Sequence, residues 1–237
     1  MDQKQIPLSL FGGSGFGLEG NQVLHSNPTN RFYQLNKEAA RFVEKKMKQA
    51  ISLKSDAEIM RYASDQVRID GLYVELGTGT GRSTNFLAAL NPSKMIYTFD
   101  SFLGLPGDWD RGNIVIPGKL FAQPEGKELP PFLLNVAVKQ GWFKDTLPQF
   151  VSVQDEPIAF LHVDCDIYES TAEGFEFFGP KMTEGTVLLF DELYNYPNYR
   201  NHEYKAFREF LEKYSFSPEY LAFNCFHEQV AVRLLKN

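Results

Sequence analysis

The chain has 237 residues, of which 43% are hydrophobic and 23% are charged, a composition typical of a single globular domain. Its formal net charge of -6 argues against a nucleic-acid partner, since proteins that bind phosphate backbones usually have a basic face. It has two cysteines without the spacing of a zinc site or a disulfide framework, and no apolar run of about 18 residues, so we expect a cytoplasmic protein that is neither secreted nor membrane-spanning.

Residues 1–66 are predicted to form an N-terminal arm and a helical layer. The segment from Phe11 to Asn21 is rich in glycine but lacks the Gly-Lys-Ser/Thr ending of a phosphate-binding loop, so we interpret it as a flexible arm. From Thr29 to about Gln66, apolar residues recur three or four positions apart between charged ones, a spacing typical of an amphipathic helix.

Residues 67–237 are predicted to form the core of one α/β domain that includes the whole chain. Apolar or β-branched runs alternate with connectors of helix length, which predicts a mostly parallel sheet with helices on both faces. These runs are GLYVELG, KMIYTFD, LNVAVKQG, PIAFLHVD and GTVLLFD. Two further runs, EYLAFNCF and QVAVRLL, are separated only by His227 and Glu228, so we expect a hairpin and a sheet that ends in an antiparallel strand.

A long connection interrupts the alternation between the second and third runs. Residues 101–132, between Asp100 and the run that begins after Phe132, are rich in proline and glycine and exceed the usual length of a loop. Loops of this length are often lids or disordered segments, and we favour a lid.

A glycine-rich turn, VELGTGTGRST, follows the first predicted strand and places Glu75 at the end of that strand. Glycines allow the backbone to approach a ligand closely at such a turn. The spacing differs from the G-x-G-x-x-G of dinucleotide-binding turns, and an acid before the first glycine suits an ammonium group better than a pyrophosphate. Asp100 ends the next strand, where a carboxylate can accept hydrogen bonds from both ribose hydroxyls.

This combination resembles the class I S-adenosylmethionine-dependent methyltransferases, whose glycine turn holds the methionine part of the cofactor and whose second-strand acid holds the ribose. The resemblance implies a Rossmann-like fold and an adenine site near Trp142, for which core packing is the alternative. A tight turn without a ligand is the alternative for the glycines. The residues that we expect at the cofactor are Glu75, Gly77, Thr78, Gly79, Gly81, Ser83, Asp100, Ser101, Phe102, Gly141, Trp142 and Asp164.

Acids follow the fourth and fifth predicted strands. Because parallel strands end at the same edge of a sheet, we expect Asp164 and Asp191 on adjacent strands about 5 Å apart. Like charges so close together need a cation or a proton between them, and a divalent metal with Glu192 or water in its oxygen shell meets that need. If the strand stays extended, Asp166 lies about 6.6 Å from Asp164 and is free to act as a general base.

The motifs DSFLGLP, GWFKDTLP, HVDCDIYEST and LLFDE are similar to those of the macrocin O-methyltransferase family, which methylates sugar hydroxyls of antibiotics. The similarity extends over roughly residues 74–210. It implies a magnesium ion held by Asp164, Asp191 and Glu192, with Asp166 as the general base.

One residue departs from the family pattern, which commonly has Asp-Asp after the fifth strand where this chain has Asp191-Glu192. The longer side chain of Glu192 would either shift the ion or fail to reach it. The alternative is that Asp164 contacts the cofactor or caps a helix while the later acids pair with neighbours such as Lys205.

A tyrosine-rich segment, LYNYPNYRNHEY, follows Glu192 at the expected active edge. Tyrosine offers a sugar both an apolar face and a hydroxyl group, so we predict substrate contacts from Tyr194, Tyr196 and His202. The alternative is that these side chains anchor the loop to the domain. His162, inside a strand, is interpreted as structural.

The sequence therefore predicts an S-adenosylmethionine-dependent O-methyltransferase acting on a hydroxyl of a sugar or sugar-bearing small molecule, assisted by Mg²⁺. The alternatives are a metal-independent O-methyltransferase for a phenol or carboxyl group, an NAD-dependent oxidoreductase, and a non-catalytic cofactor-binding protein. We expect a small-molecule acceptor, no nucleic acid and no membrane; the sequence is compatible with a homo-oligomer.

Overall fold

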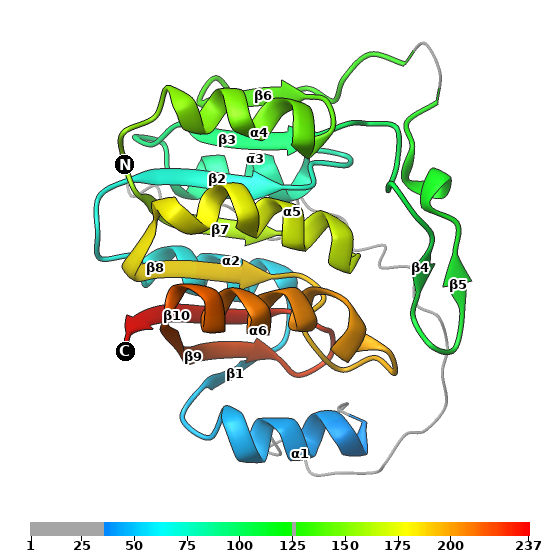
Figure 1. Ribbon diagram of the computed structural model, residues 1–237, viewed down its shortest axis with the longest axis vertical. Helices are drawn as coiled ribbons and strands as arrows, with labels where there is room; N and C mark the ends of the chain where they lie inside the picture. The colour runs from blue at the N-terminus through cyan, green and yellow to red at the C-terminus, as the bar shows by residue number, and fades with distance from the viewer. Residues whose placement is uncertain (1–35, 125–126) are drawn as a thin grey trace.

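The computed structural model describes residues 36–124 and 127–237 and contains a central eight-stranded sheet (Figure 1). The strand order is β1-β9-β10-β8-β7-β2-β3-β6. Every neighbouring pair is parallel except the two pairs that involve β10, as the sequence predicts for a mostly parallel sheet. The strands are β1 Ile51–Leu53, β2 Leu72–Leu76, β3 Ile96–Asp100, β6 Val136–Gln140, β7 Ile158–Val163, β8 Met182–Phe190, β9 Phe216–Asn224 and β10 Val230–Lys236.

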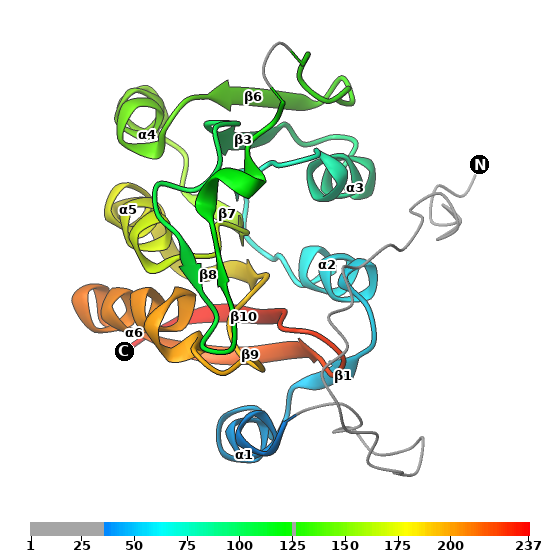
Figure 2. The same cartoon turned by 90° about the vertical axis from the view of Figure 1, so that its right-hand side faces the viewer.

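Helices cover both faces of the sheet (Figure 2). Helices α2 and α3 pack on one face, whereas α4, α5 and α6 pack on the other, and α1 lies beside the edge formed by β1. The helices are α1 Lys37–Lys46, α2 Asp56–Asp65, α3 Arg82–Leu90, α4 Phe143–Ser152, α5 Tyr168–Phe178 and α6 Glu203–Tyr214, with short 3-10 turns η2 Gly118–Phe121, η3 Gly179–Lys181 and η4 Tyr199–Asn201. None of the helices in the described ranges is long and apolar enough to cross a membrane.

The two helical layers create two separate apolar cores, because side chains alternate between the faces along each strand. On β7, Phe160 packs with Ile59 of α2 and Phe86 of α3, whereas its neighbour Leu161 belongs to the cluster that includes Phe175 of α5. The central strands are therefore buried on both faces, which explains their nearly continuous apolar sequences.

The N-terminal helical layer differs from the prediction of one amphipathic helix. Two helices, α1 and α2, are separated by strand β1, which pairs with β9 in parallel and so extends the sheet. Ser55 then begins α2 by accepting a hydrogen bond from the backbone N–H of Glu58 at 3.2 Å, as an N-cap residue does. The predicted helix before residue 36 and the glycine-rich arm lie outside the described residues.

The antiparallel C-terminal strand is present as predicted, but it lies inside the sheet, between β8 and β9, instead of at its edge. The predicted tight turn of the tail joins β9 to β10 directly, whereas α6 separates β8 from β9 in the chain and leaves a gap that β10 fills. As a result, the turn between β9 and β10 lies at the carboxyl edge of the parallel strands.

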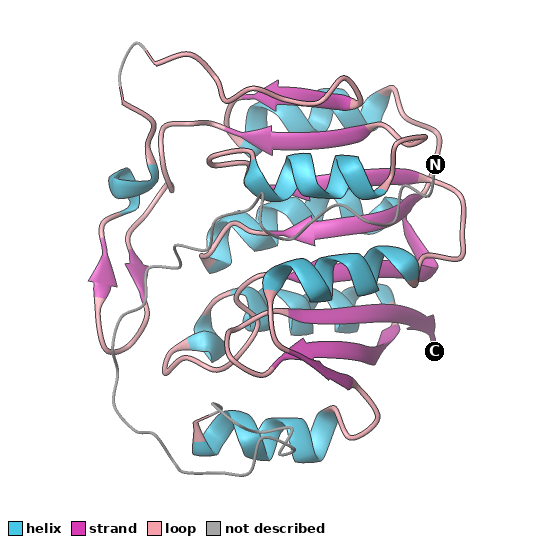
Figure 3. Cartoon of the chain, turned by 180° about the vertical axis from the view of Figure 1, so that it is seen from behind, coloured by secondary structure: helices cyan, strands magenta, loops and turns pink. Residues whose placement is uncertain are grey.

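The long connection after β3 folds into a small hairpin beyond that carboxyl edge. Its strands, β4 Trp109–Asp110 and β5 Val115–Ile116, pair with each other and not with the main sheet. Figure 3 shows from behind that this hairpin stands apart from the ends of the main strands. The hairpin lies within residues 101–132, for which the sequence predicts a lid and of which residues 125–126 are not described.

Candidate active site

A cavity of about 2270 Å³ lies at the carboxyl edge, under the hairpin. Its size exceeds the roughly 300–1,000 Å³ of a typical single-ligand pocket, so it leaves room for two ligands. It is lined by the glycine turn, the first turns of α2 and α3, the hairpin, and the acids after β7 and β8.

The glycine turn is held against Asp100. The Oδ2 atom of Asp100 accepts hydrogen bonds from the backbone N–H groups of Thr78 and Gly79, both at 2.8 Å, and its Oδ1 atom accepts one from Phe102 at 2.7 Å. Gly77 has φ 91°, and a Cβ atom there would lie 1.6 Å from the carbonyl oxygen of Asp164. Only glycine fits at this point, where the turn meets the end of β7.

Most of the residues predicted for the cofactor line the cavity, but some do not. Those that line it are Gly77, Thr78, Gly79, Ser83, Asp100, Ser101, Trp142 and Asp164. Glu75, Gly81, Phe102 and Gly141 are not among the lining residues. Gly81, with φ 75°, lies against the ring of Phe132, which closes that side of the turn. Gly141 donates its N–H to the carbonyl oxygen of Asp100 at 2.9 Å and so supports the site from behind.

The position of Glu75 contradicts its predicted contact with an ammonium group. Its side chain is 0% exposed. Its Oε2 atom accepts hydrogen bonds from the hydroxyls of Thr84 and Thr98, and its Oε1 atom lies 3.0 Å from Nδ1 of His162. Glu75 therefore orients other side chains and does not reach the cavity.

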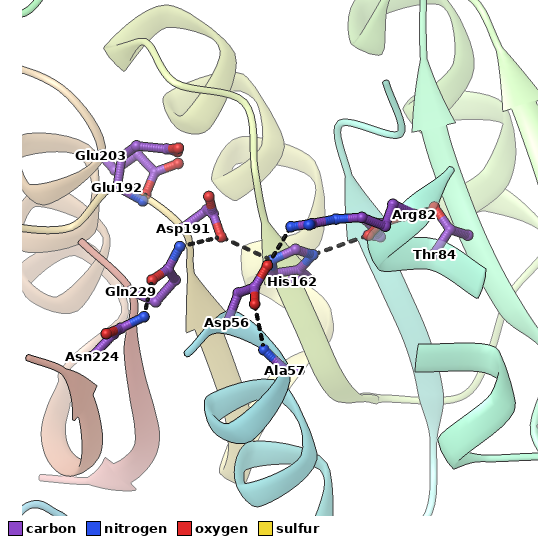
Figure 4. Close-up of polar contacts among 11 residues, drawn as sticks. Asp56, Ala57, Arg82, Thr84, His162, Asp191, Glu192, Glu203, Asn224 and Gln229 are labelled. Carbon is purple, nitrogen blue, oxygen red and sulfur yellow. Dashed lines mark hydrogen bonds and ion pairs between the residues drawn. The ribbon is translucent and has the colours of Figure 1, made fainter. Parts of the chain in front are cut away.

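Another charged pair lies at this end of the cavity. Asp56, at the start of α2, forms an ion pair with Arg82, at the start of α3, and both residues line the cavity (Figure 4). Because both side chains are partly exposed there, a zwitterionic group can bind to them in place of their mutual contact. These two residues have no signal in the sequence, because they come from different helices and form no local motif.

The acids after β7 and β8 come together as predicted, and a histidine joins them. Ligand atoms of His162, Asp164 and Asp191 all lie within 4.8 Å of one another. Burial raises the pKa of Asp164 well above its ordinary value, and the charge of Asp191 raises it further. His162 precedes Asp164 by two positions on an extended strand, so period-two alternation was the signal that could have identified it.

Glu192, also predicted as a metal ligand, lines the same cavity but is not one of the three residues of this group, and its role stays a prediction. Its side chain is buried on the far side of Asp191 from His162, next to Glu203 of α6 (Figure 4). The backbone N–H of Glu192 donates to Oε2 of Glu203 at 3.1 Å. Burial, followed by the charge of Asp191, raises the pKa of Glu192 well above its ordinary value. The alternative pairing with Lys205 is also wrong, because its Nζ lies 3.9 Å from the ring centre of Tyr168.

Asp166 lies in the cavity, but not on an extended strand as the sequence analysis assumed. Strand β7 ends at Val163, and Asp166 has φ 63°, in the left-handed region. Its pKa is raised from 3.8 to about 7, chiefly by burial and then by the charge of Asp191, against which Arg111 lowers it. A buried carboxyl group with a pKa near neutrality is suited to take up a proton during a reaction.

The tyrosines predicted to contact the substrate are buried instead. Tyr194 donates its hydroxyl to the carbonyl oxygen of Asn224 at 2.5 Å, and Tyr196 packs edge-on against Trp109. Nε2 of His202 lies 2.7 Å from the carbonyl oxygen of Asp110. None of Tyr194, Tyr196 and His202 lines the cavity, so the loop-anchoring alternative is the correct one.

These anchors hold the hairpin in place. The guanidinium of Arg111, in the hairpin, lies over the rings of both Trp109 and Tyr196, at 4.3 and 4.7 Å from their centres, and forms an ion pair with Glu228. Asn198 donates to the carbonyl oxygen of Asp110 at 2.8 Å. Arg111 and Glu228 line the cavity, although sequence reasoning had no signal for them because their contact joins residues 117 positions apart.

Comparisons with known proteins agree with this geometry. One relative, from Streptomyces olivaceus, is 27% identical to this chain over 154 residues, which cover 56% of the chain. It is the 8-demethyl-8-(2,3-dimethoxy-alpha-L-rhamnosyl)-tetracenomycin-C 4'-O-methyltransferase. The matched region spans 58% of that relative, somewhat more than half its length.

Solved structures share the fold. The calicheamicin methyltransferase CalS11 superposes with a TM-score of 0.61 at 24% identity, covering 75% of this chain and 78% of that one. The O-methyltransferase NovP superposes with a TM-score of 0.55 at 22% identity, with the same coverage.

A family model described as a methyltransferase domain matches residues 74–193, from β2 through the acids after β8. This range contains the glycine turn, Asp100 and the acids of the cavity. The match leaves the oxidoreductase alternative without support and confirms the resemblance to class I S-adenosylmethionine-dependent methyltransferases. The chain therefore belongs to the methyltransferase domain family.

Proposed function

We propose that this protein transfers the methyl group of S-adenosylmethionine to a hydroxyl of a sugar or sugar-bearing small molecule, with the help of a divalent cation. The observation that carries the proposal is that Asp100, Asp166 and the Asp164–Asp191 pair line one cavity with room for cofactor and acceptor. The names of the relatives support it, since the Streptomyces olivaceus protein is an O-methyltransferase of a rhamnosyl-bearing compound.

The cofactor would lie along the glycine turn. The carboxylate of Asp100 is already fixed by three backbone N–H groups and would accept hydrogen bonds from the ribose hydroxyls. Trp142 would cover the adenine. In place of Glu75, the Asp56–Arg82 pair would bind the amino-acid end, with Arg82 on the carboxylate and Asp56 on the ammonium group.

The reaction needs a proton acceptor, because a neutral hydroxyl attacks a sulfonium methyl poorly. The Asp166 carboxylate would take up the proton of the acceptor hydroxyl as the hydroxyl oxygen receives the methyl group, which the cofactor would supply while keeping the electrons of the carbon–sulfur bond on sulfur. The products are a methyl ether, S-adenosylhomocysteine and protonated Asp166, which returns the proton to solvent. Burial of Asp166 places its pKa near neutrality, where such a base works well.

The acids beside Asp166 would hold the cation. Two half-buried carboxyl groups, Asp164 and Asp191, meet there with a buried histidine nitrogen, a donor set that fits a divalent metal. When bound, the ion supplies positive charge that makes an oxygen of the acceptor easier to deprotonate. The residues 101–132, including the hairpin held by Arg111, would act as the lid that excludes water.

Two measurements test the proposal. Calorimetric titration with S-adenosylhomocysteine establishes the cofactor, and failure of the folded protein to bind it would remove the proposal. A panel of rhamnosides, other glycosides and simple phenols, analysed by mass spectrometry after incubation with S-adenosylmethionine, then establishes the acceptor. Methylation of phenols alone, unaffected by EDTA, would replace the proposal with the metal-independent alternative.

A further inference from the structure

The histidine among the acids has the arrangement of a metal ligand. His162 is 1% exposed, and its Nε2 atom has no hydrogen-bond partner among the described residues, although it is buried. That atom lies 3.9 Å from Oδ1 of Asp191, which is too long for a hydrogen bond. A buried nitrogen that faces a carboxylate without bonding to it is explained by a cation between the two.

The other nitrogen of the ring fixes which form of the histidine is present. Nδ1 of His162 lies 3.0 Å from Oε1 of Glu75. Glu75 is already an acceptor, because its other oxygen receives the hydroxyls of Thr84 and Thr98. Nδ1 is therefore placed to donate its proton to Glu75, and in a neutral ring with that proton the lone pair of Nε2 is directed at the acids. Ligating histidines commonly donate their second ring N–H to a carboxylate in this way.

The carboxylate of Asp191 is held by a hydrogen bond as well. Nε2 of Gln229, in the turn before β10, donates to Oδ1 of Asp191 at 3.1 Å (Figure 4). The ligand atoms of His162, Asp164 and Asp191 lie within 4.8 Å of one another. Two ligand atoms on opposite sides of one ion, each bonded at about 2.0–2.2 Å, are separated by about 4.0–4.4 Å, which is close to this distance between the ligand atoms. Glu192 lies outside this group, buried beside Glu203.

We propose that His162, Asp164 and Asp191 form the cation site of this protein, with Glu75 holding the His162 ring, and that the site prefers Mn²⁺ and similar transition ions to Mg²⁺. The proposal rests on the proposed function for its role in the reaction, but not for the site itself. Imidazole nitrogen suits transition ions, whereas Mg²⁺ is normally held by oxygen alone. The same three residues leave the remaining coordination positions open toward the cavity.

The test uses the whole chain, freed of metal by EDTA and then transferred to EDTA-free buffer, and titrated with Mn²⁺. Electron paramagnetic resonance measures free Mn²⁺ and hence affinity, while its pulsed form detects a nitrogen bound to the ion. We expect one bound Mn²⁺ with nitrogen coupling, displaced by Mg²⁺ only at concentrations at least about tenfold higher. The variant His162→Gln should lose the nitrogen coupling and about tenfold or more in affinity.

Two controls make the result specific. His202→Gln removes a nearby histidine whose Nε2 lies next to the carbonyl oxygen of Asp110, and it should keep the nitrogen coupling. Glu192→Gln should keep the affinity for Mn²⁺. Bound Mn²⁺ without nitrogen coupling in the unaltered protein, no bound Mn²⁺, or loss of binding in Glu192→Gln but not in His162→Gln would each overturn the proposal. The first two results decide the question even if His162→Gln does not fold.

The same preparation is also titrated with S-adenosylhomocysteine, so that the cation site and the proposed function are tested independently of each other. Cofactor binding together with Mn²⁺ that lacks nitrogen coupling would keep the proposed function and remove this site. Nitrogen-coupled Mn²⁺ without cofactor binding would support the site and remove the proposed function.

Discussion

Replacement of Asp166 by asparagine is the most informative single change, because it keeps the shape of the side chain and removes its ability to take up a proton. With a pKa of about 7, Asp166 is about half ionised at pH 7 and about one-tenth ionised at pH 6. A nearby cation would shift this midpoint to lower pH by favouring the ionised form. We therefore expect turnover to rise with pH with a midpoint at or below about 7.

In Asp166→Asn we expect single-turnover methyl transfer to fall by about 10²–10⁴-fold, the usual contribution of a general base, and to lose this pH dependence. Affinity for S-adenosylhomocysteine should change little. Asp155→Asn, which alters an exposed acid before β7, is the matched control and should behave like the unaltered protein. Near-normal turnover in Asp166→Asn would refute the assignment of Asp166 as the base.

The same substitution should stabilise the metal-free fold. The folded pKa of Asp166 lies above its ordinary value of 3.8, so the folded state holds the proton more tightly than the unfolded chain. This contribution to stability is fully present below about pH 4 and is lost as the pH rises to about 7. The loss corresponds to about three pKa units, or about 4 kcal/mol. In urea unfolding, the free energy of unfolding of Asp166→Asn should exceed that of the unaltered protein, and the difference should be largest above pH 7. No difference there would contradict the argument that burial raises the pKa of Asp166.

Three further predictions concern the cofactor and the hairpin. Asp100→Asn should weaken S-adenosylhomocysteine binding by about 10–100-fold in calorimetry, because one charged hydrogen bond contributes about 1.5–3 kcal/mol; unchanged affinity would place the ribose elsewhere. Arg82→Gln should lower the affinity for S-adenosylhomocysteine by about tenfold but leave unchanged the affinity for 5'-methylthioadenosine, which lacks the amino-acid end. An equal loss of affinity for both ligands would contradict the role of the pair with Asp56. Arg111→Gln should speed hydrogen exchange at residues 109–116 several-fold by removing the pair with Glu228, and unchanged exchange would show that the hairpin needs no such latch.

The fold was predictable because its signals are local. The five central parallel strands are apolar runs bounded by turn residues, and the short connection at His227 and Glu228 specified a hairpin. The position of β10 was not predictable, because the order of strands in a sheet depends on which neighbours pair over long distances. Strand β1 was missed because three residues at an edge, Ile51–Leu53, carry too little pattern to stand out between two helices.

The residues of the site were predictable only where they directly follow the ends of parallel strands. Asp100, Asp164 and Asp191 were found because parallel strands end at one edge. Tyr194 was misassigned because adjacency in the chain does not specify direction: the turn after β8 buries its side chain in the interior, whereas Glu192 lines the cavity. Arg111, brought to the site by a long connection, had no signal in the sequence at all.

The position of β10 also constrains how the protein can be synthesised and handled. Since β10 alone joins the β1–β9 pair to the rest of the sheet, the two halves of the sheet cannot unite until the ribosome has delivered the chain beyond residue 229. Folding of the complete domain is therefore expected after, and not during, synthesis of its earlier strands. Because β10 runs away from the cavity, its far end lies at the opposite edge of the sheet (Figure 1). A label or surface attachment placed at the far end of β10 should thus leave the cavity open.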